Sequence, residues 1–192
     1  ALTGDGTASL SGLITLGATA TIGSNSGTFT ISNTGTITDS GFDDLTFTGA
    51  GNGFIASIIG IGDGAVFKSG TGTWTLSGAN TYTGNTTVSV GTLVAANASA
   101  LGGTGTGTSV TAGATLNING VAVGAEAITL NGTGVSSNGA LTGTGTASLA
   151  GAVTLASDSS IGNTGTLTIS GAIGESGARA LTKVGAGTLV LS

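Results

Sequence analysis

The fold is decided by a stretch that reads Ala65-Val-Phe-Lys-Ser-Gly-Thr-Gly-Thr-Trp-Thr-Leu-Ser77 and returns as Ala180-Leu-Thr-Lys-Val-Gly-Ala-Gly-Thr-Leu-Val-Leu-Ser192. In each copy large apolar residues alternate with polar or small ones, and this period of two predicts a β-strand with one buried face. Similar alternation recurs along the chain, for example at Gly27-Thr-Phe-Thr-Ile-Ser32, with Gly, Asn and Asp clustered between the segments. We therefore expect many short strands joined by turns, and no helices.

The spacing of the repeats indicates how the strands are stacked. Three segments recur: Ala1–Leu10 at Ala140–Leu149 (offset 139), Gly27–Ser32 at Gly165–Ser170 (138), and Ala65–Ser77 at Ala180–Ser192 (115). Copy one (1–139) thus carries about 23 residues between Ser32 and Ala65 that the partial copy two (140–192) lacks. Because 115 and 138 are multiples of 23, the offsets predict coils of about 23 residues, roughly eight in all, that can be added or removed whole.

This arithmetic favours a parallel β-helix over an antiparallel sandwich, since a sandwich cannot lose two or three strands without breaking its sheet order. We expect a right-handed, all-β solenoid over residues 1–192, one continuous segment of a longer tandem array. Residues 33–64 should form one extra complete turn. Ala65–Ser77 and Ala180–Ser192 should then occupy equivalent positions on the cross-section.

The composition excludes several classes of protein. Glycine accounts for 39 of 192 residues without a collagen period, and 39% apolar residues with 6% charged ones do not fit a disordered chain. A net charge of −5 without a basic patch argues against nucleic acid as a partner. No apolar run is long enough for a membrane-spanning helix, so membrane insertion is not expected of this segment.

The stretch Lys68-Ser-Gly-Thr-Gly-Thr-Trp-Thr-Leu-Ser-Gly-Ala-Asn-Thr-Tyr-Thr-Gly-Asn-Thr-Thr-Val-Ser-Val-Gly-Thr-Leu-Val94 resembles the autotransporter-associated β-strand repeat of bacterial surface passengers. It departs from that pattern mainly at Trp74, where Leu is usual, and Leu181 to Ser192 matches the first part of the motif. The resemblance implies a right-handed parallel β-helix, secretion through a bacterial outer membrane and an extracellular or cell-surface location. It implies no activity.

Residues suited to catalysis are scarce. His and Cys are absent, which excludes Ser-His-Asp and Cys-His chemistry within the segment. Asp39, Asp43, Asp44 and Asp63 all fall in the extra coil and could be imagined as a Ca²⁺ site, but a turn or solvated loop is the simpler interpretation. We therefore predict no enzyme and no catalytic, cofactor-binding or metal-ligating residue.

The basic residues are equally few. A polysaccharide lyase would need basic residues to hold acidic sugars, and the chain has only Lys68, Arg179 and Lys183. Lys68 and Lys183 hold the same position in the repeat, so we interpret both as structural.

The Thr-x-Thr pairs raise the possibility of ice binding. Their spacings are irregular, so the pairs Thr28/Thr30, Thr46/Thr48, Thr73/Thr75, Thr81/Thr83 and Thr166/Thr168 are not expected to share a face.

Together these features predict a structural segment of an extracellular solenoid fibre or stalk that associates with itself into filaments. The alternative is an adhesin that binds glycans or other cells. That role would require exposed aromatic residues, and we expect most of the Trp, Tyr and Phe side chains to lie in the core.

Overall fold

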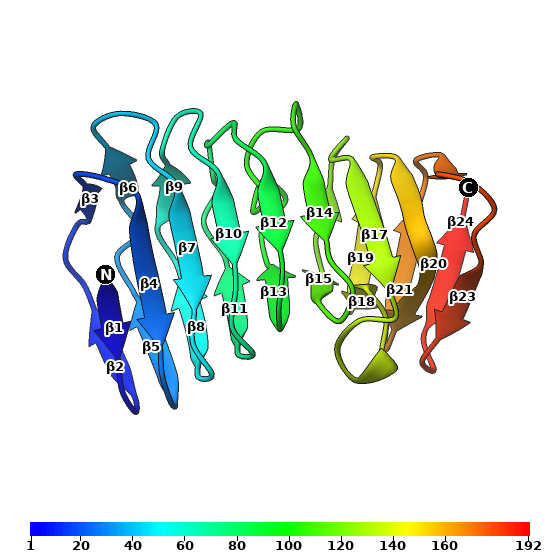
Figure 1. Ribbon diagram of the computed structural model, residues 1–192, viewed down its shortest axis with the longest axis horizontal. Helices are drawn as coiled ribbons and strands as arrows, with labels where there is room; N and C mark the ends of the chain where they lie inside the picture. The colour runs from blue at the N-terminus through cyan, green and yellow to red at the C-terminus, as the bar shows by residue number, and fades with distance from the viewer.

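A computed structural model describes residues 1–192 and shows a stack of parallel coils that runs from the N-terminus at one end to the C-terminus at the other (Figure 1). Every strand pairing is parallel and joins one coil to the next, so the strands form three ladders along the stack. The only helical element is a 3-10 turn, η1 (Val135–Ser137). The predicted all-β parallel solenoid is confirmed, while the right-handed sense of winding stays a prediction.

The first ladder contains nine strands: β1 (Leu2–Gly4), β4 (Ala20–Ser24), β7 (Leu45–Thr48), β10 (Val66–Lys68), β12 (Thr86–Val88), β14 (Thr108–Val110), β17 (Ile128–Gly132), the first part of β20 (Val153–Asn163) and β22 (Ile173–Glu175). The second ladder contains β2 (Ala8–Leu10), β5 (Thr28–Ile31), β8 (Asn52–Ile55), β11 (Thr73–Leu76), β13 (Thr92–Ala95), β15 (Thr115–Asn119), β18 (Leu141–Thr144), the second part of β20 and β23 (Leu181–Val184). The third contains β3 (Thr15–Leu16), β6 (Thr36–Asp39) and β9 (Ile58–Gly60), then β16 (Ala122–Val123), β19 (Thr146–Leu149), β21 (Thr166–Ile169) and β24 (Thr188–Leu191).

The third ladder is bridged by a side chain where regular strands are missing between β9 and β16. The amide of Asn80 accepts a hydrogen bond from the backbone N–H of Ile59 at 2.8 Å and donates one to the carbonyl of Ala100 at 2.6 Å. Asn80 is 4% exposed, so these bonds lie inside the stack. The Asn80 side-chain amide thus accepts and donates the hydrogen bonds that a backbone peptide group accepts and donates in the other ladders. It keeps three successive coils in register.

Residues 33–64 do form a complete extra turn, as predicted. They contain β6, β7, β8 and β9; the first three pair with strands of the coils before and after, and β9 pairs with β6. The solenoid has about nine turns spaced about 22 residues apart, slightly more turns and slightly fewer residues per turn than the sequence arithmetic suggested.

The predicted equivalence of Ala65–Ser77 and Ala180–Ser192 is wrong, because the second copy is turned by one face. Strands β10 and β11 of the first copy lie in the first and second ladders, whereas their sequence counterparts β23 and β24 lie in the second and third. The offset of 138 residues therefore spans six turns and one further ladder, which explains why a spacing of 23 overestimated the coil. All three ladders have apolar side chains facing inward and Thr side chains facing outward. The same alternating sequence therefore fits any of them, and a repeat can move from one ladder to the next without a change in its pattern.

Glycines of successive coils stack on one another at the corners, and the corner at which they stack differs between the two copies of the repeat. Between the first and second ladders Gly27 lies directly over Gly6, and both have positive φ. In the second copy the corresponding column lies between the second and third ladders, where Gly165 and Gly187 each sit so close to the carbonyl of the glycine one coil earlier that a Cβ would collide. Backbones in contact at the corners permit only glycine there.

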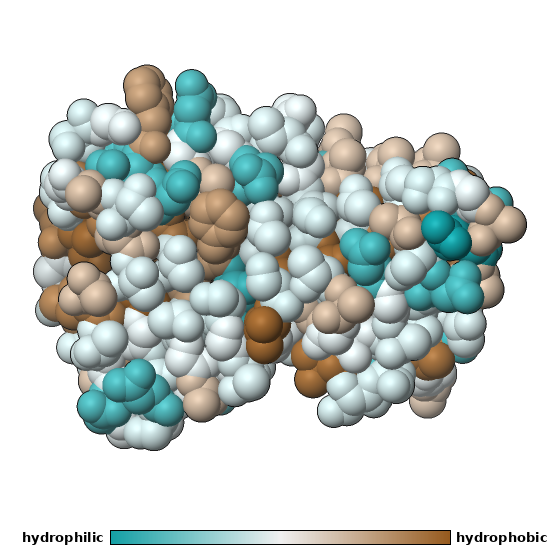
Figure 2. Space-filling view, viewed as in Figure 1, coloured by the Kyte–Doolittle hydropathy of each residue, from teal (hydrophilic) through white to brown (hydrophobic).

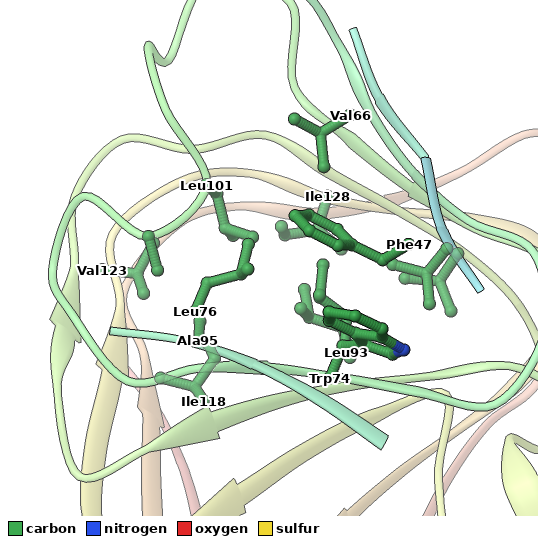
Figure 3. Packing of buried hydrophobic residues seen from close by; sticks show 14 of the residues in the cluster. Phe47, Val66, Trp74, Leu76, Leu93, Ala95, Leu101, Ile118, Val123 and Ile128 are labelled. Carbon is green, nitrogen blue, oxygen red and sulfur yellow. The ribbon is translucent and has the colours of Figure 1, made fainter. Parts of the chain in front are cut away.

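The interior is one continuous apolar core. Inward-facing side chains stack coil over coil, and Figure 3 shows Phe47, Trp74 and Leu93 among the residues that line this interior. Phe29, Gly53 and Trp74 are register neighbours on three successive coils. The residue between the two aromatic rings has to be glycine, because any side chain at Gly53 would collide with the indole ring. Such complementarity fills the core without voids.

Candidate functional site

The four acidic residues of the extra coil do not form a cluster. Asp43 and Asp44 lie in the loop between β6 and β7, as the sequence predicted. The Asp39 carboxylate accepts a hydrogen bond from the Asp43 backbone N–H, that of Asp44 from the Ala65 N–H, and that of Asp63 from the Thr83 hydroxyl. No three acidic side chains in the structure are close enough together to hold a metal ion. The carboxylates of Asp39, Asp44 and Asp63 therefore each hold a turn in place.

We expect the double replacement Asp43→Asn/Asp44→Asn to change the free energy of unfolding by less than about 1 kcal/mol, because an Asn side-chain oxygen can still accept the bond from Ala65. Thermal melting with and without a chelator measures this. A melting temperature that falls on chelation in the natural chain, and no longer does so in the variant, would show instead that these carboxylates bind a cation.

Lys68 and Lys183 share a repeat position but not an environment. Lys68 has no exposed surface, and its ammonium donates hydrogen bonds to the carbonyls of Gly70 at 2.7 Å and Val90 at 2.9 Å, the second belonging to the next coil. Burial lowers the pKa of Lys68 to about 8. Lys183 makes the corresponding bond to Gly185 at 2.8 Å but is exposed. Both bonds are structural ones between backbone and side chain, which supports the interpretation from sequence.

Most aromatic side chains lie inside, as expected. Trp74, Tyr82, Phe29 and Phe47 are buried, but the expectation fails for two phenylalanines: Phe42 is 68% exposed and Phe54 is 38% exposed. These two lie on different parts of the surface, one in the β6–β7 loop before the first ladder and one on β8 in the second ladder. They do not make a shared aromatic platform.

The Thr-x-Thr pairs are spread over all three sides of the solenoid. Thr28/Thr30 and Thr73/Thr75 lie on the second ladder, Thr46/Thr48 on the first and Thr166/Thr168 on the third. Thr81/Thr83 lies in the segment where the third ladder has no strand. The five pairs do not all lie on one face, although two of them share the second ladder, where Phe54 lies between Thr30 and Thr75 in the register. These pairs therefore do not form the regular array that ice binding needs.

A buried polar group that sequence reasoning missed lies at the corner before the first ladder. The Tyr82 hydroxyl is hydrogen-bonded to that of Thr86 at 2.6 Å, and one coil further on the Thr108 hydroxyl donates to Glu126 Oε1 at 2.7 Å. Glu126 is 2% exposed and its Oε2 has no partner. Burial raises the pKa of Glu126, and the bond from Thr108 opposes that rise only in part. Burial likewise raises the pKa of Tyr82.

This carboxyl makes stability depend on pH with a definite sign. Its pKa is higher in the folded than in the unfolded chain, so in the window above about pH 4.5 the folded state binds more protons and stability falls as pH rises. Glu126→Gln should remove that fall and stabilise the protein at neutral pH. Urea unfolding at several pH values measures it, with the exposed Glu175→Gln as control. An unchanged slope in Glu126→Gln would contradict this role.

The exposed charges avoid the flat faces. Asp5, Asp43, Asp63 and Arg179 lie in loops between strands, and Asp39 and Glu175 end their strands. Three exposed charges lie on strands: Asp158 on β20, between its first-ladder and second-ladder parts, Glu175 at the end of β22, and Lys183 on β23. Figure 2, with the first ladder toward the viewer, shows a surface that is mostly white, with scattered teal and brown groups. The faces thus consist mainly of uncharged Thr, Ser and Asn side chains on a rigid sheet.

This geometry offers little for catalysis. The buried Lys68, Tyr82 and Glu126 side chains hydrogen-bond to carbonyl or hydroxyl groups. The Asp39, Asp44 and Asp63 carboxylates are held at turns. No helix in the structure has the length and hydrophobicity required to cross a membrane. What the arrangement provides is a long, stiff surface.

Stacked coils, inward apolar columns and glycine corners define the class of parallel β-solenoid repeat proteins. The family model of the passenger-associated transport repeat matches residues 66–95 and again residues 181–192. These two matches and the stacked parallel coils support a likeness to autotransporter-passenger β-helix repeat proteins. The two matched segments begin on different ladders, β10 and β23, which shows that the repeat itself changes face.

Comparison with curated proteins and with solved structures finds no match. The family implies an extracellular or cell-surface location for the segment.

Proposed function

We propose that this segment is a non-enzymatic structural rod, part of a bacterial extracellular stalk or fibre, whose activity is stiffness and association with other copies of itself. The observation that carries the proposal is the uninterrupted stacking: the first and second ladders each run through the entire chain. Continuous hydrogen-bond ladders around an apolar core resist bending and local unfolding.

The surface supports association between copies. With exposed charges confined largely to corners and loop ends, two rods can approach side by side without strong like-charge repulsion. The outward Thr and Ser side chains are short and β-branched or small, which keeps the faces flat. Passenger repeats of this family are typically structural, and that agrees with the absence of His and Cys from the chain.

Electron microscopy of the purified 192-residue chain tests the proposal. We expect long, thin fibres with a strand spacing near about 4.8 Å along the axis by fibre diffraction. Isolated short rods at all concentrations would contradict self-association, and cleavage of an acidic polysaccharide would contradict the non-enzymatic role.

A further inference from the structure

A polar hollow of about 320 Å³ lies on the second-ladder side of the last coils. Its floor is formed by three residues without side chains, Gly143, Gly162 and Gly185. The other lining residues carry amide or hydroxyl side chains: Asn117, Asn138, Thr142, Thr144, Asn163 and Thr164. The volume lies at the lower end of the range of small-molecule sites.

The hollow exists because the row of outward-facing side chains along the second ladder is interrupted by a glycine, Gly162. Asn117 and Thr142 are register neighbours in that column, joined by a 2.8 Å hydrogen bond, and the next position is Gly162. One wall comes from the loop that contains η1: the Asn138 carbonyl lies so close to Gly162 that a Cβ there would collide with it. Only glycine can therefore occupy the floor at this point.

The interior beneath the hollow also breaks its pattern. The inward column of the second ladder is apolar through Leu76, Ala95 and Ile118, and then changes to Gly143 and Asn163. Asn163 is 3% exposed. Its amide nitrogen donates to the Thr188 carbonyl, while its amide oxygen has no partner. A buried acceptor left without a donor is costly, and such exceptions concentrate at binding sites.

The chemistry of the lining defines the class of ligand. No charged side chain lines the hollow, so an ionic ligand would not be matched. The carbon atoms of its Thr, Asn and Gly residues also give it apolar surface, on which the C–H face of a sugar ring can rest. The nearby Lys183 ammonium is already bound to the carbonyls of Val184 and Gly185. Converging amides and hydroxyls both donate and accept hydrogen bonds, which suits a neutral ligand with several hydroxyl groups. We propose that this hollow binds one unit of a neutral saccharide, a role beyond that of a structural rod.

Titration of the ¹⁵N-labelled chain with the methyl glycosides of glucose, galactose and mannose tests the site. We expect at least one glycoside to shift the amide signals of Gly143, Gly162 and Gly185 selectively, with a Kd of about 1 mM or tighter. Thr144→Val/Thr164→Val should weaken that binding about tenfold, since each loses a hydroxyl that lines the hollow. The control Thr73→Val/Thr75→Val alters the same ladder outside the hollow and should bind as the natural chain does.

Three results would overturn the assignment: no selective shift with any of the three glycosides, equal weakening in the control variant, or tighter binding of methyl glucuronide than of the neutral sugars. Thermal melts of both variants establish that they are folded. The outcome is independent of fibre formation, so loss of the saccharide site would leave the structural proposal standing.

Discussion

Trp74→Ala should lower the free energy of unfolding by about 3 to 5 kcal/mol, the range for removal of a large, fully buried aromatic side chain. The indole has no exposed surface, its ring lies 4.8 Å from that of Phe47, and its N–H donates to the Thr48 carbonyl at 3.2 Å. The cavity cannot easily collapse, because Gly53 on the preceding coil has no side chain to move into it. Urea denaturation measures the loss.

The matched control is Phe54→Ala, which removes an aromatic ring one coil earlier on the outward side of the same ladder. Phe54 is 38% exposed, and we expect its replacement to cost less than about 1.5 kcal/mol. Equal losses for the two variants would mean that the assignment of inward and outward faces is wrong.

Lys68→Ala should cost about 3 to 5 kcal/mol, because it leaves the carbonyls of Gly70 and Val90 without their charged donor in a buried corner. Lys183→Ala removes the same residue of the repeat where it is exposed, and we expect a change below about 1 kcal/mol. Denaturant unfolding of the two variants side by side checks this. A large loss of stability in Lys183→Ala would contradict the conclusion that Lys183 is exposed where Lys68 is buried.

The burial of Lys68 also makes the stability of the protein depend on pH. Its pKa falls from 10.5 to about 8 on folding, so between these values the unfolded chain binds more protons and stability rises with pH. Lys68→Met should abolish the rise. A rise of the same size in that variant would mean that another group titrates.

The strands themselves follow from local sequence. Alternation at Gly72–Ser77 and Gly27–Ser32 places Trp74, Leu76, Phe29 and Ile31 inside and their Thr neighbours outside. Gly, Asn and Asp clusters mark the turns because the chain there needs positive φ or close backbone contact. The extra turn within 33–64 was also predictable, since a coil pairs only with its neighbours.

The position of each repeat around the axis was not predictable from spacing. An offset counts residues, whereas the position around the axis also depends on the lengths of the corners. Register offsets in the structure vary from 19 residues between Thr73 and Thr92 to 27 between Gly132 and Ser159. Since every ladder accepts the same alternation, an offset of 138 residues fits six turns of 23 residues and also six turns of about 22 residues plus one ladder.

The buried polar groups depend on contacts between coils and therefore leave little trace in the sequence. Glu126 and Thr108 are 18 residues apart, and Asn80 bridges Ile59 and Ala100 at separations of 21 and 20. The hollow beside Gly162 could not be anticipated, because it depends on a loop and a column that meet only in three dimensions.

Disulfide trapping tests the central claim, the stacking of parallel coils, most directly, because the chain has no cysteine of its own. Asn117 and Thr142 are 25 residues apart yet register neighbours on adjacent coils. Asn117 and Thr129 are closer in sequence but lie on the second and first ladders. We predict that Asn117→Cys/Thr142→Cys forms a disulfide on mild oxidation and that Asn117→Cys/Thr129→Cys does not, because bridged Cα atoms must lie within about 7 Å. The reverse result, as an antiparallel hairpin would give, would contradict the solenoid.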